Sequence, residues 1–107
     1  EIVKACNGDE PKAEIILCTP PRATENPEYS NCGYMPIIRK AAEFIRNYAF
    51  NNKIHLIDIA KYDGFGTGHE TEMQPNDGLH FGESGYKKLA EIIAGGIRDY
   101  QAERKIK

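Results

Sequence analysis

The chain is poor in residues that mark several large classes of protein. It has no tryptophan and only three cysteines, Cys6, Cys18 and Cys32, among its 107 residues. An odd number of cysteines without a C-x-x-C pair excludes a zinc ribbon and disfavours a disulfide framework. The cysteines therefore do not indicate whether the protein resides in an oxidising or a reducing compartment. Cys18 lies in an apolar run, and we expect it to be a buried small hydrophobic residue.

Long apolar runs and a strong excess of one charge are also absent. No stretch comes near the ~18 apolar residues that span a bilayer, so the sequence predicts no membrane span. The first ten residues are mostly polar and do not begin with Met, which is not the pattern of a signal peptide. A net charge of −2 gives no long-range attraction for polyanions, so we expect no nucleic-acid partner.

The order of the apolar patterns predicts a mixed α/β fold. Continuous apolar runs at 13–19 and 54–59 have the length of strands that are covered on both faces. Between them, apolar residues recur every three or four positions from Pro36 to about Asn51, which predicts an amphipathic helix. A second helical pattern runs from Tyr86 to about Tyr100. A strand–helix–strand unit predicts parallel strands joined by a right-handed crossover.

The segments between these elements are expected to be irregular. Proline is frequent from Pro20 to Pro36, which predicts a long surface loop, and glycine is frequent from Lys61 to His80. Within the first helix, the stripe formed by Phe44, Ile45 and Tyr48 is predicted to belong to the core.

Two apolar parallel strands and two helices do not make a complete fold. Each strand is expected to have further neighbours, and the helices to cover more sheet. We therefore interpret residues 1–107 as one partial domain, the C-terminal half of a three-layer α/β/α sandwich with a parallel sheet. Residues Glu1–Cys6 have the pattern of a helix end, as though the chain began inside a helix. Free strand edges also favour a homo-oligomer.

One short segment carries side chains suited to catalysis. Asp77 and His80 stand three residues apart, with Gly78 between them, just before the terminal helix. Open α/β folds place their sites at the carboxyl end of the sheet, where this segment should lie. A carboxylate that accepts a hydrogen bond from Nδ1–H fixes the tautomer of a histidine, and Nε2 can then act as a general base in a pocket. We predict His80 as that base and Asp77 as the group that orients it.

The sequence around this dyad resembles a known family. Asp-Gly-Leu-His at 77–80, followed by Gly-x-x-Gly-Tyr at 82–86 and an apolar helix, is similar to the last motif block of the SGNH or GDSL hydrolases, which are esterases and lipases. The order of the earlier elements is similar as well, so the resemblance covers nearly the whole chain. It implies an SGNH, flavodoxin-like fold and hydrolysis of a carbohydrate or small acyl ester through an acyl-enzyme. It implies no cofactor and no metal.

The family's serine nucleophile and oxyanion donors have no counterpart here. Ser30 lies in the long loop, and we expect Ser84, four residues beyond His80, to cap the terminal helix. Gly8-Asp9-Glu10 has Glu where the family has Ser. A base without a nucleophile has nothing to activate, so this piece alone should be inactive. We expect an N-terminal segment of the same protein, or another chain, to supply the missing groups.

Two other functions fit the same residues. One is a noncatalytic relative that binds a carbohydrate or a partner protein. The other is a flavodoxin-like module that completes its sheet by dimerisation and binds a nucleotide at the carboxyl end of the strands. The remaining histidines do not predict a metal site, because His69 has no partner at ligand spacing and His55 lies within a strand, where we expect it to pack half-buried.

Overall fold

The computed structural model describes residues 14–106. Cys6 and the helix end predicted at Glu1–Cys6 lie outside the described residues. The described chain is a mixed α/β fold with three α-helices and a two-stranded parallel sheet. Its elements in chain order are β1 (Ile16–Cys18), α2 (Met35–Asn51), β2 (His55–Ile57), the 3-10 helix η1 (Ile59–Lys61), α3 (Glu70–Met73) and α4 (Glu83–Ile106).

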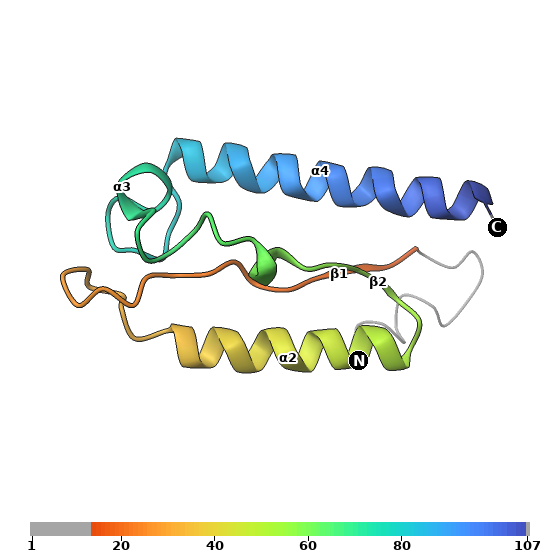
Figure 1. Ribbon diagram of the computed structural model, residues 1–107, viewed down its shortest axis with the longest axis horizontal. Coiled ribbons are helices and arrows are strands. Elements are labelled where there is room, and N and C mark those ends of the chain that lie inside the picture. Colours follow the sequence, from red (N-terminus) through yellow and green to blue (C-terminus); the bar gives the residue numbers. More distant parts are fainter. Residues whose placement is uncertain (1–13, 107) are drawn as a thin grey trace.

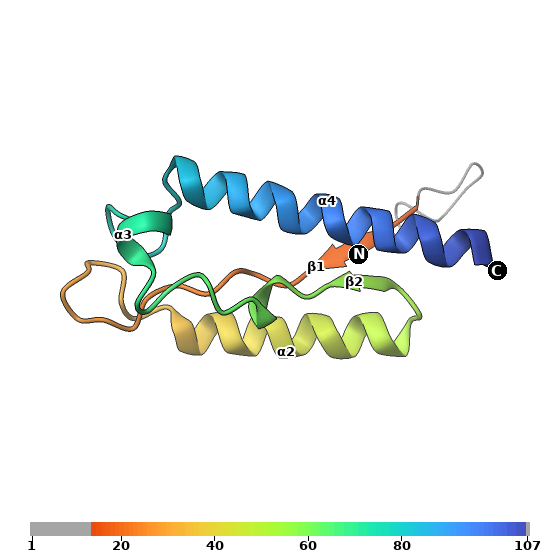
Figure 2. The same cartoon turned by 45° about the horizontal axis from the view of Figure 1, so that its top comes forward.

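The two strands lie side by side between two long helices. β1 pairs with β2 in parallel, in a register that runs from Ile16 opposite His55 to Cys18 opposite Ile57, so the predicted parallel arrangement is confirmed. Helix α2 lies on one side of the strands and α4 on the other, and the turned view keeps this order (Figures 1 and 2). Both strands are shorter than the apolar runs that predicted them.

The core is small and lies mostly between the sheet and α4. Its buried cluster contains Ile57, Ile59, Phe65 and Met73, and side chains of α4 pack against it. Helix α4 approaches β2 closely because it has no side chain at Gly96: a Cβ built there would lie 2.4 Å from Cγ1 of Ile57. A larger residue at 96 would therefore push α4 away from the sheet.

Helix α2 begins at Met35 and ends at Asn51, as the apolar spacing predicted. Its buried face consists of Met35, Ala42 and Ala49, which are spaced seven residues apart. The prediction that Phe44 belongs to the core is wrong, since its side chain is 70% exposed. The reason is that α2 covers only two strands within residues 14–106, and a sheet this narrow buries one thin stripe of the helix.

Three further expectations, two for single residues and one for the end of a helix, are also wrong. Cys18, the last residue of β1, is exposed, whereas Ile16 and Leu17 are half-buried. Ser84 lies in the first turn of α4 and does not precede it; Gly82 takes that place, and its carbonyl accepts the first helical hydrogen bond, from Tyr86 N at 3.0 Å. Helix α4 runs past Tyr100, because the charged residues that follow are good helix formers.

The two loops are less irregular and less exposed than expected. Ala23 and Thr24, in the predicted surface loop at 20–36, are buried. The glycine-rich stretch at 61–80 contains the helical turn α3. Within residues 14–106, no helix is both long and apolar enough to cross a membrane.

Candidate catalytic dyad

The connection between α3 and α4 forms a closed loop that carries the dyad. Its two ends meet where Gly82 N donates to the carbonyl of Met73 at 3.0 Å. A tight turn opens the loop, with Gly78 N donating to the carbonyl of Gln74 at 3.1 Å. Asp77 and His80 therefore project from a short segment that is held between two helix ends.

Gly78 is required by the shape of this loop. Its φ is +79°, in the left-handed region that residues with a Cβ rarely adopt. A Cβ built there would lie 2.0 Å from Cγ2 of Thr24, and Thr24 N donates to the Gly78 carbonyl at 2.8 Å. The dyad loop is thus packed directly against the segment that follows β1.

The carboxylate of Asp77 contacts the imidazole of His80, as their spacing predicted. Nδ1 of His80 lies 2.5 Å from Oδ2 of Asp77. The other oxygen, Oδ1, accepts hydrogen bonds from Leu79 N at 2.9 Å and from His80 N at 2.8 Å. The contact from His80 and these two main-chain donors hold the pKa of the Asp77 carboxyl well below its ordinary value.

Asn31 is a further donor to Asp77 that sequence reasoning did not find. Its Nδ2 donates to Oδ2 of Asp77 at 2.9 Å, and its main-chain N donates to the Asp77 carbonyl at 3.1 Å. Both oxygens of the carboxylate therefore have two donors each. Asn31 and Asp77 are 46 residues apart in the chain, so no local pattern could have paired them.

The ring of His80 is open on the side away from Asp77. The His80 side chain is 72% exposed, whereas that of Asp77 is 19% exposed. Since Nδ1 faces the carboxylate, Nε2 lies at the exposed side of the ring and can be reached by a group that approaches from outside. Three cavities in the described part of the chain are lined by other residues.

A buried polar network lies beneath the segments that carry the dyad loop. The Thr24 hydroxyl donates to the carboxylate of Glu70 and accepts a hydrogen bond from Asn26 N at 2.9 Å. The hydrogen bond from Thr24 lowers the pKa of Glu70, and this effect outweighs the burial of the group. The fully buried Gln74 donates to the Arg22 carbonyl and accepts from Gly66 N, both at 2.7 Å. Sequence patterns gave no signal for this network, because polar residues in a glycine-rich stretch normally suggest a solvated loop.

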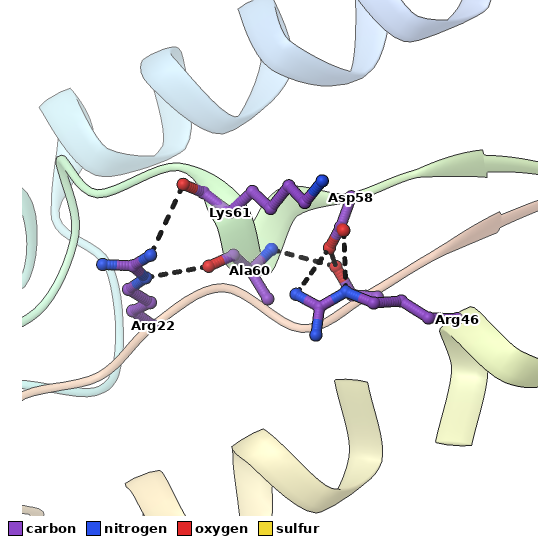
Figure 3. Close-up of polar contacts among 6 residues, drawn as sticks. Arg22, Arg46, Asp58, Ala60 and Lys61 are labelled. Atoms are coloured by element: carbon purple, nitrogen blue, oxygen red, sulfur yellow. Dashed lines mark hydrogen bonds and ion pairs between the residues drawn. The ribbon is translucent and has the colours of Figure 1, made fainter. Parts of the chain in front are cut away.

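A second polar network fixes the end of β2 (Figure 3). Asp58 accepts hydrogen bonds from Nε of Arg46 at 2.7 Å and from the Thr19 hydroxyl at 2.7 Å. Burial raises the pKa of the Asp58 carboxyl, but these donors outweigh it and the net shift is downward. Arg22 donates to the Ala60 carbonyl at 2.8 Å. Because these groups satisfy one another, they tie α2 and β1 to the end of β2, and we assign them a structural role.

The other candidate side chains are not drawn into the site. Ser30 and Ser84 are exposed, and within residues 14–106 neither hydroxyl is hydrogen-bonded to the His80 ring. His55 is half-buried, as predicted, with its ring 5.2 Å from that of Tyr100. His69 is exposed at the start of α3. The described residues contain no group of three or more His, Cys, Asp or Glu side chains placed to hold a metal ion.

Comparison of the chain with protein-family models, with curated proteins and with solved structures finds no match. Its function is therefore inferred from the chemistry of the dyad and from the resemblance of the motif around it. An imidazole whose Nδ1 is held by a carboxylate and whose Nε2 is exposed can accept a proton from an approaching hydroxyl and later return it.

Proposed function

We propose that this chain supplies the His–Asp part of a serine esterase triad of the SGNH type. The observation that carries the proposal is the contact between Asp77 and His80, with the far side of the ring exposed. The nucleophilic serine and the oxyanion donors would come from a segment outside residues 1–107 or from a second chain. The substrate class is a carbohydrate ester or a small acyl ester.

The geometry suits both proton transfers of ester hydrolysis. Nε2 of His80 would take the proton of the serine hydroxyl as its oxygen bonds to the ester carbonyl carbon. The imidazolium would then give that proton to the departing alcohol as the ester C–O bond breaks, and water would hydrolyse the acyl-enzyme by the same route. Asp77 stabilises the imidazolium only while it is ionised. The lowered pKa of its carboxyl supports this role across the neutral range.

The packing supports the view that residues 14–106 belong to a larger three-layer sandwich. Phe44 is 70% exposed and Phe50 is 84% exposed, on the helix that covers the sheet. The radius of gyration is 15.7 Å, whereas a compact domain of this length has about 13 Å. Both values fit helices that extend beyond a sheet too narrow to fill the space between them. On this proposal, further parallel strands add to the open edge of β1, complete the sheet and bring the serine to His80, while the outer edge of β2 stays the edge of the sheet.

The proposal is tested by ester hydrolysis in the longest polypeptide encoded by the reading frame that contains residues 1–107. With p-nitrophenyl acetate as substrate, His80→Ala should lower kcat/KM by about 10³-fold or more, because it removes the base of the triad. Asp77→Asn should lower it by about 10²-fold to 10⁴-fold, because the ring loses the acceptor that fixes its tautomer.

His69→Ala is the matched control, because it removes an exposed histidine from a nearby loop without touching the dyad. Its kcat/KM should equal that of the unchanged protein, and added imidazole should partly restore His80→Ala. Equal kcat/KM values for His80→Ala and His69→Ala would contradict the proposal and favour the noncatalytic, ligand-binding alternative.

A further inference from the structure

A groove runs along β2, and neither Asp77 nor His80 is among its described lining residues, so its binding of a ligand does not require the proposed esterase. Its volume is about 620 Å³, within the usual range for binding clefts. One wall is β2 with the residue after it, and the other is one stripe of α4. The described lining residues are His55, Leu56, Ile57, Asp58, Glu91, Ile92, Gly95, Gly96, Asp99, Ala102 and Glu103.

The groove lies at the edge of the sheet and not on its face. Successive side chains of a strand point to opposite faces, so a cavity on one face would contact every second residue. This cavity is lined by four consecutive residues, His55 to Asp58, and by no described residue of β1. It therefore follows the edge of β2 that is turned away from β1.

Main-chain groups of β2 face this groove. The carbonyl of Ile57 accepts Thr19 N at 3.2 Å, so the main-chain groups of Ile57 point toward β1. Because the main-chain N–H and C=O directions alternate along a strand, those of Leu56 point the other way, into the groove. Within residues 14–106 this edge of β2 has no strand partner, and an unpaired strand edge is a template for one more strand.

The helical wall of the groove is acidic. Glu91, Asp99 and Glu103 line it, and none of its described lining residues is Lys or Arg. Lys88 pairs with Glu91 at 3.1 Å and His55 contacts Glu103 at 3.3 Å, while Asp99 forms no ion pair with the side chains described in residues 14–104. Gly95, between the acids, has no side chain, and the heavy atom nearest to a Cβ built there would be Nη2 of Arg98 at 3.8 Å, so one guanidinium also lies beside this wall.

We propose that this groove binds an extended basic peptide segment, which adds to the free edge of β2 as a strand. The main-chain groups of Leu56 would pair with the segment, and Lys or Arg on its alternate residues would face Asp99 and Glu103. A second copy of this chain is the less suitable occupant. Pairing two such edges would bring two acidic walls together, and like charges opposed in this way disfavour association.

The test uses the full chain and fluorescent six-residue peptides, with binding followed by fluorescence anisotropy. A peptide of alternating Lys and Val should bind, and its Glu–Val counterpart should not. A Lys–Val peptide with N-methyl groups on alternate residues keeps the charge but cannot pair as a strand, so it should bind at least about tenfold more weakly. Raising the salt from about 0.02 M to about 0.3 M should weaken the Lys–Val complex.

Variants of the chain locate the binding surface. Asp99→Asn with Glu103→Gln should weaken Lys–Val binding about fivefold to tenfold at low salt, because two exposed ion pairs are lost. Glu28→Gln, an exposed acid in another loop, is the control and should leave binding unchanged. Leu56→Pro removes the main-chain donor that points into the groove, at an edge position where proline is tolerated, and it should weaken peptide binding at least about tenfold; the far-UV circular dichroism of the variant shows whether the chain stays folded.

Three results would overturn the inference. Equal binding of the methylated and unmethylated peptides would reduce the effect to nonspecific attraction by charge. Equal binding by the Asp99/Glu103 double variant and by Glu28→Gln would place the peptide elsewhere. A dimer of the chain that excludes the peptide and is broken by Leu56→Pro would identify a second copy as the occupant. None of these measurements depends on ester hydrolysis, so failure here and failure of the proposed esterase can be told apart.

Discussion

Replacing Gly78 by alanine tests how the dyad loop is held. Two separate costs are expected at this position. The residue has a φ of +79°, and holding a residue with a Cβ in this left-handed region costs roughly 1–2 kcal/mol. The new Cβ would also lie 2.0 Å from Cγ2 of Thr24, and crowding of this kind in a packed site costs about 1–3 kcal/mol. Gly78→Ala should therefore lower the free energy of unfolding by about 2–5 kcal/mol.

Two other glycines separate these costs. Gly68 has a φ of +90° and no heavy atom within 4 Å of a built Cβ, so Gly68→Ala should show the backbone cost alone, about 1–2 kcal/mol. Gly33 has neither a positive φ nor a close neighbour. Gly33→Ala should leave stability unchanged or raise it by up to about 1 kcal/mol, because alanine restricts the unfolded chain.

The steric contact between a Cβ at position 78 and Thr24 can be removed without changing the backbone conformation. Thr24→Ser removes the methyl group that the new Cβ would meet, and it keeps the hydroxyl that donates to Glu70. In a double-mutant cycle followed by urea unfolding, Thr24→Ser should recover about 1–2 kcal/mol in the Gly78→Ala background. If Gly78→Ala costs no more than Gly68→Ala, or if the cycle shows no coupling, Thr24 does not pack on the loop as described.

Two further predictions concern the buried polar groups. Gln74→Leu should lower the free energy of unfolding by about 2–4 kcal/mol, because the N–H of Gly66 and the carbonyl of Arg22 lose their buried partner. The measurement is urea unfolding, with Gln101→Leu on the exposed end of α4 as the control. An equal loss of unfolding free energy in the two variants would show that Gln74 is not buried. The pKa values of Asp58, Glu70 and Asp77 are lowered in the folded chain, so their stabilisation is complete above the ordinary values of about 3.9–4.3 and is lost as the pH falls below them. Unfolding free energy should therefore fall between about pH 5 and pH 2, less steeply in Asp58→Asn; a slope that this substitution leaves unchanged would contradict the shift at Asp58.

The sequence predicted the elements that have a strong period and missed what depends on distant partners. Helix α2 and the parallel strand pair follow from apolar spacing, which is a local property. Whether a residue such as Phe44 is covered depends on the width of the sheet beside it, and no pattern within the helix contains that information. The short helix α3 was missed because glycine and polar residues surround it, although Glu70 and Met73 are buried by contacts from elsewhere in the fold.

The dyad shows the same division between local and distant causes. Three-residue spacing around Gly78 is enough to bring Asp77 to His80, and this contact was predicted. The donors that complete the carboxylate and brace the loop lie at Asn31 and Thr24, about fifty residues earlier, on the segment that follows β1. A His–Asp pair made by spacing alone would turn freely with its loop. Because Asp77 and Gly78, which precede the ring in this loop, are both bonded to the segment that follows β1, the loop is instead held against that segment. On the proposed function, the carboxyl end of the strands is where a serine on a neighbouring parallel strand would have to be delivered.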